Sequence, residues 1–176
     1  MNDVAQNILL GSLASLVSSF VFMYFIYGIR PNIKISDRIS THINDKNIRE
    51  YTFKIINKTR HDIIDVKLTI SVVIIESIMG GVTHYNQHIN LRRSEFFKIN
   101  KYNKKDQDAQ WALRFGTEDD IMSIWNEGNG GYIVVRIYAR HSLSGFAKVF
   151  EKRYYVKSMI IEGAHGFGED MSVYPK

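Results

Sequence analysis

The sequence predicts a mainly β protein, an antiparallel sandwich or barrel with one short helix, joined to one N-terminal transmembrane α-helix. Three observations lead to this prediction. The chain opens with a long uncharged apolar run, many later segments alternate between apolar and polar side chains, and one short segment has helical spacing. Several strands separated by polar turns, with little helix, are typical of antiparallel folds rather than βαβ folds.

The apolar run is long enough to cross a bilayer. No charged side chain occurs from Val4 to Ile29, and a helix of about 20 apolar residues crosses the roughly 30 Å of hydrocarbon. A cleaved signal peptide would begin with basic residues and have an apolar core of about 7–15 residues, whereas this chain begins with Asp3 and no Lys or Arg. We therefore expect a short tail at residues 1–7 and an uncleaved span at residues 8–29.

Basic residues mark the C-terminal side of this span. Arg30, Lys34 and Arg38 follow it directly, and no base precedes it. By the positive-inside rule the following domain faces the cytoplasm, so we expect a single-pass protein of the cell inner membrane. These three side chains are then the candidates to face anionic lipid headgroups. The lack of cysteine fits a reducing compartment.

Small residues recur along one face of the span. Gly11, Ser15 and Ser19 are spaced four apart, which places them together on a helix. Such a face lets helix backbones approach closely in lipid and lets hydroxyls bond across the contact, so we interpret it as a helix-association seam. The alternative is that the serine hydroxyls bond back to their own helix.

After the span, strands are predicted almost throughout. Pro31 ends the helix because its ring cannot continue the hydrogen-bonded turns. We expect a juxtamembrane segment with the first strand at residues 30–41 and a cytoplasmic β-sandwich domain at residues 42–176. Apolar residues at every second position mark most of the strands: Ile33 and Ile35; Tyr51, Phe53 and Ile55; Ile64 to Ile74; Trp111 to Phe115; Ile133 to Ile137. A further strand is predicted around residues Ala147 to Val156.

The longest of these strands defines a register. Its alternation predicts an inward set, namely Ile64, Val66, Leu68, Ile70 and Val72. The polar stretch before it, residues 57–61, has the composition of a hairpin connection. Turns are predicted at residues 80–81, 130–131 and 142–145, and a lysine-rich loop at residues 100–110.

One short helix is predicted near residue 120. Thr117 is a good N-cap, the three acidic residues that follow it suit the positive end of a helix dipole, and Ile121, Ile124 and Trp125 fall on one face. Gly128 would end the helix.

Chemistry-bearing motifs are weak throughout the sequence. His84 and His88 have the spacing of a helical metal pair, but in a strand they lie about 13 Å apart, too far to share one ion. Asn57-Lys58-Thr59 matches a glycosylation sequon, which a cytoplasmic domain does not use. Without a nucleophile, carboxylate-pair or phosphate-loop pattern, we expect a non-enzymatic protein with no cofactor and no metal.

Positive charge is spread over two later stretches. Residues 92–105 and 148–157 are rich in Lys and Arg, and the net charge is +5 with a pI near 9.3. A solvated face is the simpler interpretation, so nucleic acid is not an expected partner. The nucleic-acid alternative would use interleaved aromatics such as Phe96, Phe97 and Tyr102.

The order of several short motifs resembles the cytoplasmic domain of inward-rectifier potassium channels. Arg30-Pro31-Asn32-Ile33-Lys34 is similar to the start of that domain, and residues 51–60 with 62–67 look like its first long strands. Residues 145–154 are similar to a later hairpin, and Gly163-Ala164-His165-Gly166-Phe167 resembles a terminal Gly-His-x-Phe motif. The resemblance covers residues 30 to about 170.

That resemblance implies an immunoglobulin-like sandwich that assembles around a symmetry axis, with a tetramer as one such assembly. It also implies lipid contact at the positions of Arg30 and Lys34. The chain departs from the family in having one span and no selectivity-filter sequence, and Asn32 replaces the base that usually follows the proline.

Two functional hypotheses follow. The first is a non-enzymatic, membrane-anchored sensor or assembly protein whose β domain binds a nucleotide or protein ligand and whose helices form a homo-oligomer in the membrane lipid. The second is an effector of bacterial anti-phage defence that senses a nucleotide second messenger and disrupts the membrane by oligomerising. The second is an interpretation of architecture alone.

Overall fold

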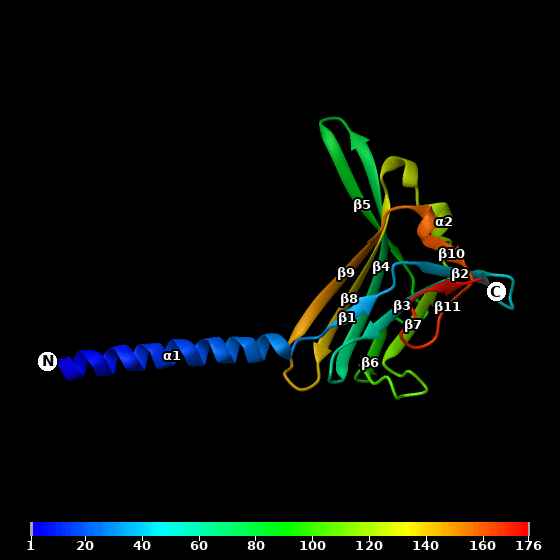
Figure 1. Cartoon of the computed structure of the whole chain (residues 1–176). Helices are drawn as coiled ribbons and strands as arrows, with labels where there is room; N and C mark the ends of the chain where they lie inside the picture. Colours follow the sequence, from blue (N-terminus) through cyan, green and yellow to red (C-terminus); the bar gives the residue numbers. More distant parts are fainter. Residues whose placement is uncertain (1, 176) are drawn as a thin grey trace.

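A computed structural model describes residues 2–175 and shows one long helix standing apart from a β domain (Figure 1). Helix α1 (Asn2–Gly28) contains an apolar stretch, Asp3–Ile26, that is long and apolar enough to cross a membrane. The side chains of this stretch are exposed rather than packed on the β domain. The membrane-length helix predicted from the sequence is therefore present.

Two five-stranded sheets form the β domain. The first contains β1 (Ile33–Ile35), β2 (Ile39–Ile43), β3 (Arg49–Asn57), β7 (Ala112–Thr117) and β10 (Ile160–Glu162). The second contains β4 (Ile63–Ile78), β5 (Gly81–Ile89), β6 (Glu95–Ile99), β8 (Tyr132–His141) and β9 (Ala147–Tyr154). The smaller elements are α2 (Ile121–Ile124), two 3-10 turns (Glu127–Asn129 and Lys157–Met159), β11 (Ala164–His165) and β12 (Val173–Tyr174).

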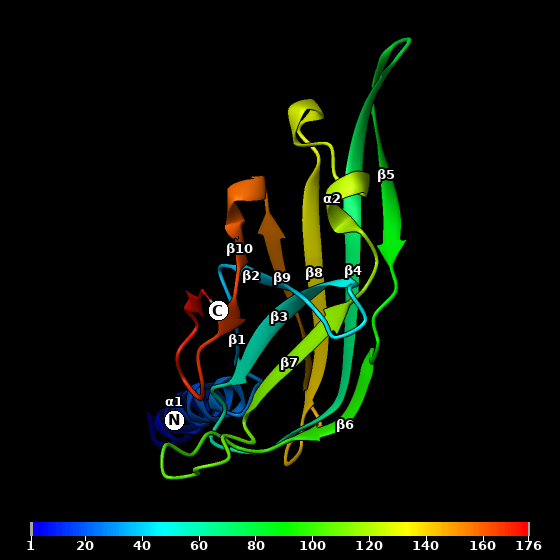
Figure 2. The same ribbon diagram turned by 90° about the vertical axis from the view of Figure 1, so that its right-hand side faces the viewer.

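The two sheets pack face to face around one apolar core, as predicted for a sandwich (Figure 2). Phe53 of β3 stacks on Phe115 of β7, with ring centroids 5.6 Å apart. The same ring meets the edge of Tyr154, which comes from β9 of the opposite sheet, at 6.0 Å. Aromatic contacts thus join the sheets at the centre of the domain.

One strand pairing departs from the predicted antiparallel pattern. Strands β2 and β10 run parallel, with Ile39 opposite Ile160. β10 reaches this position from the opposite sheet through the turn after β9, so it is not tied to β2 by a hairpin that would force an antiparallel direction. Strand β2 also runs across residue 41, the boundary drawn from the sequence.

The predicted register of the longest strand is correct except at its start. Val66, Leu68, Ile70 and Val72 are buried, but Ile63 rather than Ile64 points into the core. A β-bulge between Ile64 and Lys67 shifts the pairing with β8, and at its centre Asp65 adopts a φ of 51°. The extra residue of a bulge exchanges the faces of the residues before it, which the alternation alone does not reveal.

Residues 57–61 do not form the predicted hairpin connection. Strands β3 and β4 belong to different sheets, so this segment crosses from one sheet to the other. The turns predicted at residues 80–81 and 142–145 are confirmed, since they join β4 to β5 and β8 to β9.

The predicted short helix is present, but its N-cap is not Thr117. Asp120 caps α2, its carboxylate accepting hydrogen bonds from the backbone N–H groups of Met122 and Ser123. Thr117 is the last residue of β7, and its hydroxyl donates to the Asn90 carbonyl at 2.6 Å. The helix begins three residues later than predicted because the strand continues through Thr117.

Two alanine variants on either side of the sheet test the position of the bulge. Ile63→Ala removes a fully buried side chain, and we expect a loss of about 2–5 kcal/mol in the free energy of unfolding. Ile64→Ala removes the same atoms from a partly exposed site, and we expect a loss of roughly 1 kcal/mol. Denaturant unfolding followed by tryptophan fluorescence measures both. A larger loss for Ile64→Ala would contradict the bulge.

Candidate functional site

The segment between α1 and β1 is bound to the β domain by hydrogen bonds. The Ile29 carbonyl accepts from the Ser144 hydroxyl at 2.9 Å. The Asn32 N–H donates to the Thr59 hydroxyl at 2.9 Å, and the Asn32 carbonyl accepts from the Lys58 N–H at 2.8 Å. Pro31 between them is buried. We call residues 29–32 with Lys58, Thr59 and Ser144 the joint.

A buried asparagine supports the joint from behind. Asn57 is 1% exposed, and its side-chain amide donates to the carbonyls of His61 at 3.1 Å and Asn100 at 2.8 Å. Its side-chain oxygen accepts from the Thr59 N–H at 2.8 Å, which orients the Thr59 hydroxyl toward Asn32. In the folded domain the residues that match a sequon thus form a structural bracket. Sequence reasoning missed this role, although Asn-x-Thr is also a pattern for a side-chain-capped turn.

The turn between β8 and β9 lies against the end of α1 through Ser144 (Figure 1). Its base is closed by the His141 N–H, which donates to the Phe146 carbonyl at 2.8 Å. Nδ1 of the buried His141 ring accepts from the Ser144 N–H at 3.1 Å, and the ring meets that of His61 at 5.1 Å. Burial, and then the neighbouring His61, lower the pKa of His141 from its ordinary value of 6.5.

The three predicted lipid-facing bases do not gather in one place. Arg30 and Lys34 are exposed at the joint and just beyond it. Arg38 is turned elsewhere, because its guanidinium donates at 3.0 Å to the carbonyl of Ser158, which follows the end of β9 remote from the joint. The joint therefore contains Arg30 and has Lys34 two residues beyond it, and lipid contact by these bases stays a prediction.

The predicted association seam lies on one exposed face of α1. Gly11, Ser15 and Ser19 are all exposed, and nothing lies within 4 Å of a Cβ added at Gly11. The Ser19 hydroxyl donates to the Ser15 carbonyl at 2.8 Å. At Ser19 the structure thus shows the intrahelical alternative, while the seam itself stays a prediction.

A groove opens on the outer surface of the sheet that contains β4, β6 and β8. Its volume is about 570 Å³. The lining residues are Asp65, Val66, Lys67, Glu95, Phe96, Phe97, Tyr138 and Arg140. Phe97 is 89% exposed, so the groove presents an uncovered aromatic ring to solvent. The bulge at Asp65 contributes one of its walls, since it turns that carboxylate toward Arg140.

Charges within this groove are paired. Arg140 lies 3.2 Å from Asp65, and Lys67 lies 3.3 Å from Glu95. Two cations and two carboxylates leave the lining without net charge. A phosphate would have to displace one of these carboxylates, whereas an apolar or aromatic group could pack on Phe97 without breaking an ion pair.

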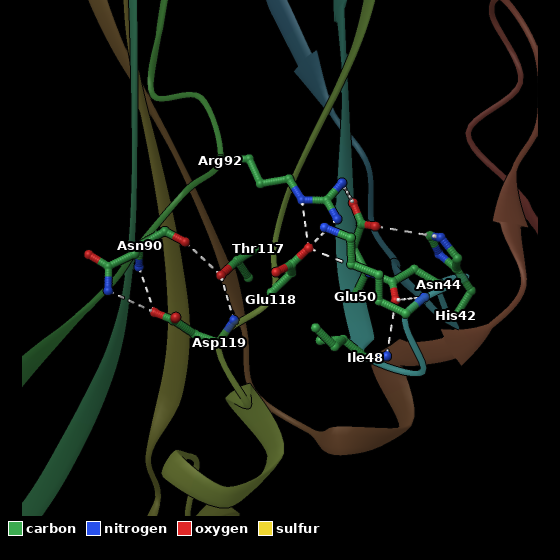
Figure 3. Close-up of polar contacts among 10 residues, drawn as sticks. His42, Asn44, Ile48, Glu50, Asn90, Arg92, Thr117, Glu118 and Asp119 are labelled. Carbon is green, nitrogen blue, oxygen red and sulfur yellow. Dashed lines mark hydrogen bonds and ion pairs between the residues drawn. The ribbon is translucent and has the colours of Figure 1, made fainter.

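A separate polar cluster ties the segment after β5 to the first sheet (Figure 3). Arg92 binds Glu50 at 3.0 Å and also forms an ion pair with Glu118, while His42 lies 3.6 Å from Glu50. The N–H and side-chain amide of Asn90 both donate to Asp119. The base at position 92, part of a lysine- and arginine-rich stretch, is therefore engaged within the domain.

The two spaced histidines lie on β5, and both are exposed. His88 contacts the Ser71 hydroxyl at 3.2 Å through its ring nitrogen. Among residues 2–175, no group of three or more His, Asp or Glu side chains is placed to hold a metal ion.

No family model matches the chain. A search of curated protein sequences likewise finds no significant match. The resemblance to inward-rectifier cytoplasmic domains therefore stays a prediction, and the functional argument depends on the joint, the groove and α1.

The buried His141 makes the β domain sensitive to acid. In the pH range below about 6.5 the unfolded chain binds a proton that the folded chain excludes, so the free energy of unfolding decreases as the pH falls through this range. We expect the thermal midpoint to fall less in His141→Asn, whose side-chain oxygen can replace Nδ1 as acceptor. Thermal melts from pH about 7.5 to 5.5 measure this.

The exposed His84 is the control, since His84→Asn should keep the acid sensitivity of the parent. Equal pH dependence in His141→Asn and the parent would show that His141 does not titrate between the two states.

Proposed function

We propose that the protein is a non-enzymatic, single-pass membrane protein that acts as a sensor or assembly protein. In this proposal α1 spans the inner membrane, the β domain lies in the cytoplasm and binds a ligand or partner, and the helices form a homo-oligomer. The observation that carries the proposal is the joint, which couples the end of α1 to the β domain through three hydrogen bonds near 2.9 Å.

A coupled joint suits signal transfer better than a simple tether. A flexible Gly- or Ser-rich linker would let the domain rotate without moving the helix. Here a change in the orientation of the domain moves Ile29 and Asn32 directly, and with them the exposed faces of α1. A ligand that binds one arrangement of neighbouring domains better than another would thereby shift the packing of the helices.

The groove on the second sheet supports the ligand-binding part of the proposal. Its exposed Phe97 and the nearby Tyr138 are residue types that anchor protein interfaces. Since the two cations of the lining are paired with Asp65 and Glu95, the groove favours a protein segment over a nucleotide.

The assembly part is supported by the small-residue face of α1. Gly11, Ser15 and Ser19 are exposed together and permit close helix approach. The resemblance to inward rectifiers favours an assembly around a symmetry axis, with a tetramer as one such assembly, and lipid contact by Arg30 and Lys34.

The same face favours a second candidate function. Serine hydroxyls along one side of a membrane helix can line a polar path once several helices assemble. In this alternative the protein is an effector of bacterial anti-phage defence that senses a nucleotide second messenger and disrupts the membrane.

Helix association is tested with Ser15→Leu. The larger side chain holds the backbones apart, so we expect the chemically cross-linked ladder of full-length protein in bilayers to weaken about tenfold or more. Leu13→Ile is the matched control on another face and should leave the ladder unchanged. A ladder unaffected by Ser15→Leu would contradict the seam.

Dye leakage from proteoliposomes separates the two functions. The sensor predicts intact vesicles in the presence or absence of nucleotide. The effector predicts nucleotide-dependent leakage that Ser15→Leu abolishes and Leu13→Ile retains, and that result would replace the sensor proposal.

A further inference from the structure

We infer that the β8–β9 turn is a second membrane contact, in which Leu143 and Phe146 insert at the headgroup boundary of an anionic bilayer beside α1. The inference deepens the proposed function and rests on the proposal that α1 spans the membrane. It identifies the lipid-facing surface of the domain as this turn and its basic neighbours.

The position of the turn follows from one hydrogen bond. The Ser144 hydroxyl donates at 2.9 Å to the carbonyl of Ile29, the first residue after α1. If α1 crosses a bilayer, Ile29 lies where the helix leaves the hydrocarbon, and the turn is held at the same depth. Figure 1 shows the β8–β9 turn reaching back to the level of the end of α1, while the rest of the sandwich extends away from it.

The turn presents apolar side chains outward. Leu143 is 70% exposed and Phe146 is 40% exposed, although both flank a residue that contacts the helix end. On its inner side the turn is closed by the buried His141 ring, which accepts from the Ser144 N–H, and by the hydrogen bond from the His141 N–H to the Phe146 carbonyl. Leucine and phenylalanine are favoured at the boundary between headgroups and acyl chains, where their apolar surface leaves water.

The positive charge near the turn favours an anionic membrane surface as its partner. The turn from His141 to Ala147 contains no acidic residue. Three exposed bases lie near it in the chain or next to a residue that contacts it, namely Arg30 after Ile29, Arg60 before His61 and Lys148 at the start of β9. An acidic neighbour, Asp62, accepts from the Ser142 N–H through its backbone carbonyl at 3.1 Å, while its carboxylate lies 3.4 Å from Lys98. Apolar residues with bases nearby complement anionic headgroups above acyl chains. A soluble protein bound here would have to occupy the space of the bilayer that surrounds the end of α1.

The test uses single cysteines in the full-length protein, which has none of its own. Leu143→Cys carries an environment-sensitive fluorophore, and the protein is reconstituted in nanodiscs whose lipids bear a nitroxide, in separate samples, near the headgroup end or near the methyl end of the acyl chain. Leu13→Cys in the middle of α1 is the membrane reference. Ile43→Cys, 56% exposed at the end of β2 on the side of the domain farthest from α1, is the control for water exposure (Figure 1).

We expect nitroxide lipids to quench the dye at position 143 several-fold more than at position 43. Quenching should increase when phosphatidylglycerol is added to phosphatidylcholine, and the double variant Arg60→Gln with Lys148→Gln should remove most of that increase. As a label-free measurement, hydrogen exchange of the amides at residues 142–147 in the unmodified chain should be slower in nanodiscs than in detergent.

Quenching at position 143 no greater than at position 43, with the label at position 13 strongly quenched, would overturn the inference while leaving the membrane anchor intact. Equal quenching in phosphatidylcholine with and without phosphatidylglycerol would overturn its anionic part. A label at position 13 that nitroxide lipids do not reach would overturn the proposed membrane function itself.

Discussion

The buried side-chain amide of Asn57 is the interaction on which the arrangement of this molecule depends. It lies where β3 ends and the chain crosses to the other sheet, and it binds the carbonyls of His61 and Asn100 together with the Thr59 N–H. Leaving such buried groups unpaired costs about 1–3 kcal/mol each. Because the same bracket directs the Thr59 hydroxyl to Asn32, one side chain couples the crossing between the sheets to the attachment of the helix.

Part of the charge of this protein is paired within the β domain. The sequence is basic, yet many of its cations bind carboxylates of the same domain, as Arg92 binds Glu50, Arg136 binds Glu151, and Lys152 binds Asp37. Exposed pairs of this kind contribute only about 0–1 kcal/mol to stability. Their main effect is to neutralise part of the positive charge on the sandwich, and the joint shares in this pairing, since Lys58 forms an ion pair with Glu169.

Local patterns in the sequence predicted the longer central strands, but not most of the edge strands or the pairing partners. Period-two alternation located β1, β3, β4, β7 and β8, because each strand has one face in a common core, whereas strands such as β5, β6 and β10 were not predicted. It could not predict the bulge at Asp65, the parallel pairing of β10 with β2, or the passage of residues 57–61 between sheets, since these depend on contacts distant in sequence. The candidate site shows the same division. The apolar helix and its flanking bases could be identified from the sequence. The Asn57 bracket and the groove around Phe97 could not, because they are formed by segments that are distant in sequence and meet only in the fold.

Strand β4 connects the region of the joint to the distant end of the domain. It runs for 16 residues, from a start near the Asn57 bracket to the tip of the β4–β5 hairpin, and at about 3.3 Å per residue it spans roughly 50 Å. If the β domain tilts by one degree about the end of α1, the tip of the β4–β5 hairpin moves by roughly 0.9 Å. A tilt of a few degrees at the helix end therefore moves the tip of the hairpin by roughly 2–4 Å.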